Sequence, residues 1–244
     1  MTVWTCNACG FQGKTSKEHL IHVAVGRVIL ANKALSPESV REHLQDDEFK
    51  RYGLYASPSE NDRLEDAWIN GFIRGLICKG CNEGWARRLE EEAGANLYDF
   101  TILGGAANAE ILRRWAWYFA MKLRYAHSRP EGLADGPLLT VLPTLADAEA
   151  KAALPVVLAR LTASPRVWRF SAIGRGWAGA DTPFISWIVR GVVWMVVVPQ
   201  GPKVILPIPT TPLVDGLRLY KVPTITKKQV VGMFTAPPAS FERG

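Results

Sequence analysis

Four cysteines in two equally spaced pairs are the residues of this chain best suited to chemistry. Cys6 is paired with Cys9 and Cys78 with Cys81, each with two residues in between. A Cys-x-x-Cys turn presents two thiolates on one side of a tight loop, and two such turns supply the four ligands of a tetrahedral Zn²⁺ ion. The two pairs therefore predict one structural Cys₄ zinc site.

Other uses of these cysteines fit the sequence less well. Four cysteines are too few for the disulfide framework of a 244-residue chain. Neither pair follows a predicted strand of a βαβ unit, as a redox-active Cys-x-x-Cys does. A Cys₂His₂ site that used His19 and His22 would have a shorter histidine spacing than the usual one, and it would leave the second cysteine pair without a role.

An acid–histidine pair and an asparagine complete a longer pattern. Glu18-His19 follows the first cysteine pair, and Asn82 directly follows the second. This order resembles the HNH, or ββα-metal, nucleases, in the variant that ends in Asn and carries a Cys₄ zinc, as in phage junction-resolving endonucleases. The string from Cys78 to Trp85 is also similar to a group of bacterial and phage HNH-like proteins. The motif match covers roughly residues 4–93.

The resemblance implies a role for each of these residues. His19 would be the general base that takes a proton from the attacking water, which a neutral imidazole can do near neutral pH. Glu18 and Asn82 would provide oxygen ligands for a catalytic Mg²⁺ or Mn²⁺ ion. The structural zinc would hold a strand pair against the following helix and so fix the distance between His19 and Asn82.

A non-catalytic interpretation of the same residues stays open. The middle Asn of the family has no counterpart in residues 73–77, and the nearest candidate is Asn70. Glu18 and His19 could be a helix-start acid beside a surface histidine, and Asn82 could be a helix N-cap. The module would then recognise DNA, RNA or a protein without cutting it, as an inhibitor or adaptor of a phage or defence system would.

The charge of the chain is unevenly distributed. Lys and Arg outnumber Asp and Glu by 29 to 23, which gives a net charge of +6. Residues 1–100 carry 12 basic and 15 acidic side chains, whereas residues 166–244 carry 10 and 3. Contacts to nucleic-acid phosphates are therefore predicted in the last third, at Arg169, Arg175, Lys227 and Lys228. A solvated surface explains the same charges without a partner.

Composition and patterning exclude several classes of protein. Apolar residues make up 48% of the chain, enough for a sizeable core. The most apolar run, Phe184 to Pro199, is interrupted by Arg190 and Gly191, so it predicts two buried strands rather than a membrane span. The N-terminus lacks the basic and apolar stretches of a secretory signal, and the expected location is the cytoplasm.

Hydrophobic spacing predicts the elements that would position these residues. Trp115, Phe119 and Leu123 form a core stripe, with Arg114 and Lys122 on the remaining faces of that helix. Glu90 is predicted on the solvated face of the helix after the second cysteine pair. Helices are expected over 36–53, 64–72, 85–93, 108–126 and, with a kink at Pro155, 144–161. Strands are expected over 167–173, 184–189, 192–198 and 204–208.

We therefore expect an α+β protein in three parts. Residues 1–103 would form a zinc-stabilised ββα-metal module with a helical insertion at about 23–72, residues 104–163 a helical middle, and residues 164–244 a β-rich basic part. The expected function is metal-dependent hydrolysis of phosphodiester bonds in nucleic acid, with DNA favoured as substrate. A binding module for nucleic acid or a protein partner, and a structural part of a larger assembly, are the alternatives. The sequence does not predict an oligomeric state.

Overall fold

The computed structural model describes part of the chain, and all statements below concern that part. It comprises residues 4–19, 22, 24–25, 28, 72–127, 145, 155–161, 184–189, 191–197, 208–226 and 228–229. Within it the chain contains both helices and antiparallel sheets, which confirms the α+β class. The helices expected over 36–53 and 64–71, the strand expected over 167–173 and most of the strand expected over 204–208 lie outside the described residues.

The N-terminal part combines a two-stranded sheet with a long helical run. β1 (Thr15–His19) pairs antiparallel with β2 (Phe72–Cys78), so Phe72 begins a strand where the sequence predicted the end of a helix. The chain then continues through α5 (Lys79–Cys81), η1 (Asn82–Ala86), α6 (Arg87–Tyr98) and η2 (Asp99–Leu103). The run is kinked at Gly84 and ends at Gly104, whose φ of +72° suits a residue without a Cβ.

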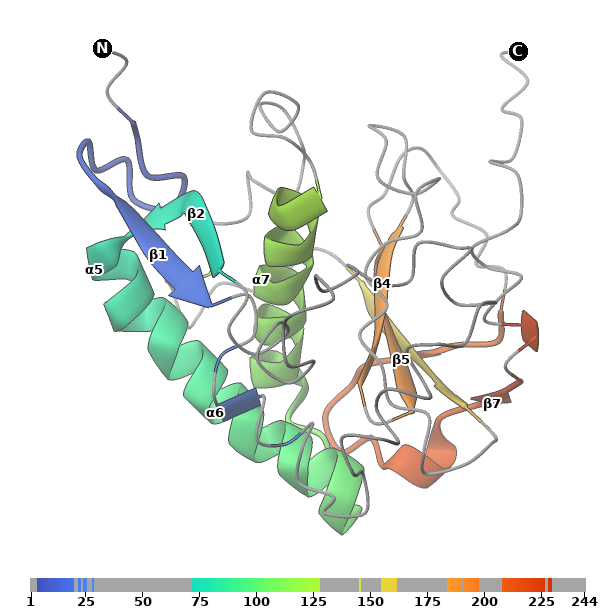
Figure 1. Cartoon of the computed structure of the whole chain (residues 1–244). Helices are drawn as coiled ribbons and strands as arrows, with labels where there is room; N and C mark the ends of the chain where they lie inside the picture. Colours follow the sequence, from blue (N-terminus) through green and yellow to red (C-terminus); the bar gives the residue numbers. More distant parts are fainter. Residues whose placement is uncertain are drawn as a thin grey trace, which may run out of the picture.

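The helix α7 (Ala109–His127) connects the two halves of the molecule. It matches the helix expected over 108–126, and its Trp115 and Phe119 are buried as predicted. Figure 1 shows α7 between the β1–β2 sheet with α6 on one side and the second sheet on the other. None of the helices in the described residues is both long and apolar enough to cross a membrane.

The second sheet has the strand order β4-β5-β3-β6, and β7 pairs in parallel with β3. The expected strands at 184–189 and 192–198 are confirmed, whereas the helix expected to run to residue 161 is wrong, because its last part is β3. Val156 to Leu161 are paired on both edges and almost entirely buried, and this pairing outweighs the helical preference of the Ala- and Leu-rich stretch. The bounds are β3 Val156–Leu161, β4 Phe184–Val189, β5 Val192–Val197, β6 Thr211–Pro212 and β7 Thr224–Ile225.

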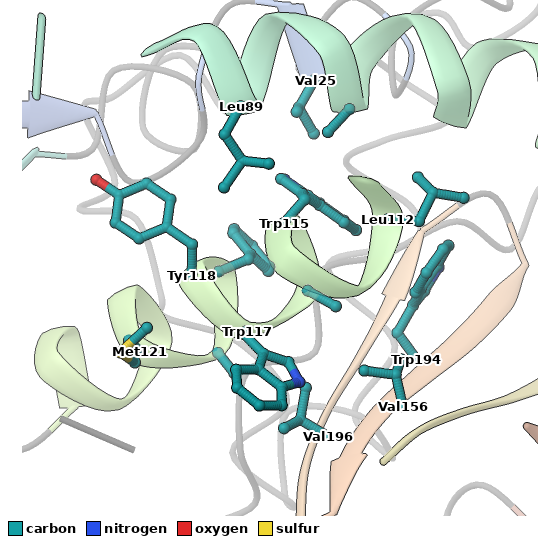
Figure 2. Close-up of a cluster of buried hydrophobic side chains, with 14 of the residues drawn as sticks. Val25, Leu89, Leu112, Trp115, Trp117, Tyr118, Met121, Val156, Trp194 and Val196 are labelled. Atoms are coloured by element: carbon teal, nitrogen blue, oxygen red, sulfur yellow. The ribbon is translucent and has the colours of Figure 1, made fainter. Parts of the chain in front are cut away.

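One continuous cluster of buried side chains joins the zinc-ligand region, α7 and the second sheet. Its centre is aromatic: the ring of Trp115 lies 5.4 Å from that of Trp194 at 88°, and 6.0 Å from that of Trp187 at 82°. Trp187 and Trp194 are directly opposed on β4 and β5. Figure 2 shows Trp115 of α7 between Leu89 of α6 and Trp194 of β5, with the ring of Tyr118 on the side away from Trp194. These tryptophans are therefore core residues.

A C-terminal segment, residues 208–226 with η6 (Leu219–Lys221), is hydrogen-bonded to the start of α7. The Asp215 Oδ1 atom accepts a hydrogen bond of 2.7 Å from the backbone N–H of Ala109, the first residue of the helix. The N–H of Ala107 donates to the carbonyl of Leu217 at 2.8 Å, and the N–H of Gly216 donates back to Ala107 at 3.1 Å. The first of these bonds satisfies an N–H that α7 cannot satisfy itself, and the other two hold the residues just before the helix.

Candidate metal centre and the buried acid beside it

The four cysteine sulfurs lie together in space, as the spacing of the pairs predicts. One ligand atom from each of Cys6, Cys9, Cys78 and Cys81 falls within 4.8 Å of the others. Sγ atoms of Cys6 and Cys81 are 4.0 Å apart, and those of Cys9 and Cys78 are 3.7 Å apart. Tetrahedral bonds of about 2.3 Å to a central ion place sulfurs about 3.8 Å apart, so the cluster has the size of a four-thiolate metal site. The cysteines are free, not disulfide-bonded.

The first cysteine turn is docked onto β2 by hydrogen bonds to backbone carbonyls. The indole N–H of Trp4 donates to the Gly75 carbonyl at 3.0 Å, and the Asn7 side-chain amide donates to the Leu76 carbonyl at 2.8 Å. Gly75 has a φ of +92°, a conformation that favours glycine. The turn is therefore held in register with the strand that carries the second cysteine pair.

Backbone N–H groups point at the sulfurs and favour their thiolate form. The N–H of Cys78 donates to Cys6 Sγ at 3.2 Å, and the N–H of Cys81 donates to Cys78 Sγ at 3.5 Å. Burial raises the pKa of Cys6, but backbone donors at Cys9, Cys78 and Ala8 outweigh it and bring the pKa to about 7. Burial raises the pKa of Cys81. The cluster can thus hold a cation that stabilises several thiolates at once.

Histidine takes no part in this cluster among the residues that the structure describes. The four grouped ligands are all cysteines, which excludes the Cys₂His₂ alternative there. The Nδ1 atom of His22 instead accepts a hydrogen bond of 3.3 Å from the backbone N–H of Ala24. The backbone of His19 pairs with that of Phe72 at the end of β1, and its side chain lies outside the described residues.

Asn82 lies inside the helical run and not at its start. The cap of the run is Cys78, whose sulfur accepts from the Cys81 N–H, and Asn82 itself has helical φ and ψ of −64° and −48°. Its backbone N–H donates to the Lys79 carbonyl. The interpretation of Asn82 as a helix N-cap is therefore wrong. Its half-buried side-chain amide follows the last cysteine directly without serving as the cap.

Glu18 is buried, with 1% of its surface exposed, and it faces α7. The hydroxyl of Tyr118 donates a hydrogen bond to Glu18 Oε2. The ammonium of Lys122 lies 4.5 Å from the centre of the Tyr118 ring and 2.6 Å from Glu90 Oε1. Side chains from β1, α6 and α7 thus meet in one buried polar cluster, which we call the Glu18 cluster: Glu18, Glu90, Tyr118 and Lys122.

Burial dominates the electrostatics of the Glu18 cluster. It raises the pKa of Glu18, although the positive charge of Lys122 and the hydrogen bond from Tyr118 oppose the shift. Burial and the negative charges of Glu18 and Glu90 raise the pKa of Tyr118, which keeps its hydroxyl a hydrogen-bond donor. Glu18 Oε1 has no hydrogen-bond partner. Two acids share one internal cation, so one carboxylate oxygen stays uncompensated.

Two members of this cluster that the sequence predicts to be exposed are in fact buried. Glu90 and Lys122 were expected on solvated helix faces, but they are 3% and 1% exposed. Arg114, also expected outside, is buried and donates from Nη2 to the Leu145 carbonyl at 2.8 Å. No local signal distinguishes Glu90 and Lys122 from surface charges, because only the packing of α6 on α7 brings the two side chains together.

The predicted nucleic-acid contacts fall mostly beyond the described residues. Arg169, Arg175 and Lys227 lie outside them. Lys228 is described and is exposed. The exposed position suits a phosphate contact as well as a solvated charge, so these four residues stay predictions.

Comparisons with known proteins add no further assignment, since no family model, no curated protein and no solved structure matches the chain.

Proposed function

We propose that residues 4–98 form a zinc-stabilised ββα module of the HNH type, and that the chain is a metal-dependent nuclease that hydrolyses phosphodiester bonds, with DNA as the favoured substrate. The observation that carries the proposal is the Cys₄ cluster. It joins the β1–β2 pair to the start of the helical run, which is the order of elements that the resemblance implies. Its sulfur spacing and soft thiolate donors fit Zn²⁺, and four protein ligands leave no open position for chemistry.

The reacting groups of this proposal belong to residues that follow each cysteine pair in the sequence, although His19 lies at the end of β1 away from Cys78. His19 ends β1, and its imidazole would accept the proton of the attacking water. The side-chain oxygen of Asn82 would contribute to a Mg²⁺ or Mn²⁺ site, and such an ion, when bound, neutralises charge on the phosphate and the leaving oxygen. The Glu18 carboxylate fits this ion poorly, because it is buried, accepts from Tyr118 and lies beside the positive charge of Lys122.

Replacement of His19 by Ala tests the proposal. The zinc-loaded variant should lose Mg²⁺- or Mn²⁺-dependent nicking of supercoiled plasmid while its zinc content stays at one ion per chain. A general base contributes roughly 10²- to 10⁴-fold to a rate, so the loss should be easy to measure. His22→Ala is the matched control, since that imidazole caps a local backbone N–H. Equal nicking by His19→Ala and wild type would remove the nuclease assignment.

A second candidate function is a zinc-stabilised binding module that does not cut. The burial of Glu18 favours it, because the acid that the resemblance assigns to the catalytic ion faces the protein interior. In this case the wild-type protein binds DNA, RNA or a protein partner, and no divalent ion changes the nucleic acid. Affinity for a labelled duplex should then fall steeply with salt if phosphate contacts in the basic last third carry it. Salt-independent binding would favour a protein partner.

A further inference from the structure

The Glu18 cluster links three elements through side chains that are nearly inaccessible to solvent. Glu18 and its neighbour on the same face of β1, Ser16, both point inward, and the Ser16 hydroxyl donates to the Ile77 carbonyl at 2.8 Å. Tyr118 donates to Glu18 from α7, and Lys122 binds Glu90 of α6. The last part of β1 is therefore tied both to β2 and to the helical layer.

A hard metal ion is poorly accommodated at Glu18. An ion there would lie where a nucleic-acid phosphate has no access, because the side chain is 1% exposed. It would also approach the ammonium of Lys122, and unscreened like charges in a buried site repel strongly. Lys122 already places one positive charge between the two acids of the cluster, which is the electrostatic task that a bound ion would perform.

We infer that Glu18 is a positioning residue: its carboxylate, which accepts a hydrogen bond from Tyr118, fixes the end of β1 on α7 and so sets the backbone from which the His19 side chain departs. The inference deepens the proposed function, because the role of His19 comes from that proposal. It replaces the expectation that Glu18 is a ligand of the catalytic ion. Residues that never touch substrate, Tyr118 foremost, then control how well His19 is aligned.

The test compares variants that change one atom or one hydroxyl in the cluster. Glu18→Gln keeps the shape of the side chain, and Tyr118→Phe removes only the donor to it. Both should lower kcat for plasmid nicking by roughly 10- to 100-fold, since small misplacements of a reacting group have effects of that size. The double variant should be no slower than the slower single variant, because both substitutions act on the same hydrogen bond: Gln replaces the charged acceptor by a weaker neutral one, and Phe removes the donor. The Mg²⁺ concentration for half-maximal activity should stay within about twofold of wild type.

A metal-ligand role for Glu18 predicts a different pattern. Glu18→Gln would raise the half-activating Mg²⁺ concentration by more than about tenfold and would weaken Mn²⁺ binding, seen by electron paramagnetic resonance of the zinc-loaded chain, whereas Tyr118→Phe would change neither. That result would overturn the inference. Tyr98→Phe is the control for loss of a tyrosine hydroxyl, because Tyr98 is 41% exposed.

A readout that needs no activity separates failure of the inference from failure of the proposed function. The ring resonances of His19 can be assigned in ¹H–¹⁵N spectra by their absence in His19→Ala. Both Glu18→Gln and Tyr118→Phe should shift them, and Tyr98→Phe should not. Unshifted resonances in both cluster variants would overturn the positioning role even if the enzyme cuts DNA. Shifted resonances in a chain that does not cut would uphold it and reject only the nuclease.

Discussion

The two ends of the continuous buried core contain different kinds of side chain. Around β1, β2 and the start of the helical run lie the four cysteine sulfurs, three of them from buried residues, and the Glu18 cluster. Around β4 and β5, the residues that face α7 are aliphatic or aromatic, with Trp187 and Trp194 stacked on each other and edge-on to Trp115 of α7. Thiolates and buried charges require defined partners at defined distances, whereas aromatic and aliphatic side chains require mainly shape.

This difference indicates which end of the molecule depends on a precise arrangement of its side chains. Buried polar groups lose their hydration and recover it only through well-placed partners, so they specify one arrangement more sharply than apolar packing does. The residues that the resemblance assigns to chemistry, Glu18, His19 and Asn82, belong to the polar end. The aromatic end supplies a scaffold. Helix α7 belongs to both ends, and its Tyr118 and Lys122 make the contacts at the polar end.

Removal of the proposed zinc ion should have the largest effect and should fall on the polar end alone. Structural zinc binding reaches about 10–16 kcal/mol in zinc-finger peptides, which exceeds any single side-chain contribution in this core. After chelation, or in Cys78→Ser, hydrogen exchange should accelerate in residues 4–19 and 72–81 while β4 and β5 stay protected. Return of protection on adding zinc back is the control. Uniform loss of protection in both regions would show that they do not differ in this way.

Truncation of an aromatic side chain should affect the other end. Trp194→Ala should lower the free energy of unfolding by about 3–5 kcal/mol, since it leaves a large cavity beside Trp115 and Trp187. The variant should nevertheless bind one zinc per chain, because no sulfur contact changes. Denaturant unfolding and metal analysis measure the two quantities. Trp194→Phe, which keeps an aromatic ring, should lose less stability; an equal loss would argue against cavity formation as the cause.

The hydrogen bond from Ala109 to Asp215 should contribute less. Loss of a side-chain acceptor at a helix start has an effect of about 1 kcal/mol, so Asp215→Ala should shift the unfolding midpoint by a small, measurable amount. Asp215→Asn retains an acceptor oxygen and should be closer to wild type. The experiment asks whether the C-terminal segment stabilises α7. Identical stability of all three proteins would mean that the segment only lies beside the helix.

The smallest effect should be the contribution of Glu18 to the pH dependence of the free energy of unfolding. Burial holds the pKa of Glu18 above its ordinary value, although Lys122 and Tyr118 oppose the shift and Glu90 assists it. The folded state therefore favours the protonated acid, and this contribution is present below the ordinary pKa and is lost as the pH rises through the folded pKa. Relative to Glu18→Gln, wild type should become less stable as the pH rises above the ordinary glutamate pKa of about 4. Urea unfolding at several pH values measures the difference, and parallel curves would contradict it.

The sequence predicted those elements whose own residues show a clear hydrophobic pattern. The stripe of Trp115 and Phe119 located α7 to within one residue at each end, and the apolar runs located β4 and β5. β3 was predicted as a helix, because its Ala- and Leu-rich context has helical propensity. Its strand conformation depends on pairing with β5, β6 and β7, which lie 31 or more residues away along the chain.

The candidate site shows the same division between local and long-range information. The Cys₄ cluster was predictable, because two identical short motifs with four equivalent ligands leave little freedom in how they combine. The Glu18 cluster was not, since Glu90 and Lys122 look like ordinary surface charges in their own helices. Only the packing of α6 on α7 buries them, and their pairing spans 32 residues of sequence.

Asp215 binds the start of α7 from a distant point of the chain, so the partners of this helix become available at different times during synthesis. The second cysteine pair emerges 72 residues after the first, so the metal cluster can assemble early. Asp215 emerges 106 residues after Ala109, which corresponds to roughly 5–20 s of synthesis. Until Trp187 and Trp194 emerge, α7 has its polar neighbours but not the strands that cover Trp115, and the Asp215 acceptor follows later still. The nascent chain therefore exposes its most aromatic surface longest, and a chaperone that acts on it would meet the four-cysteine cluster already assembled.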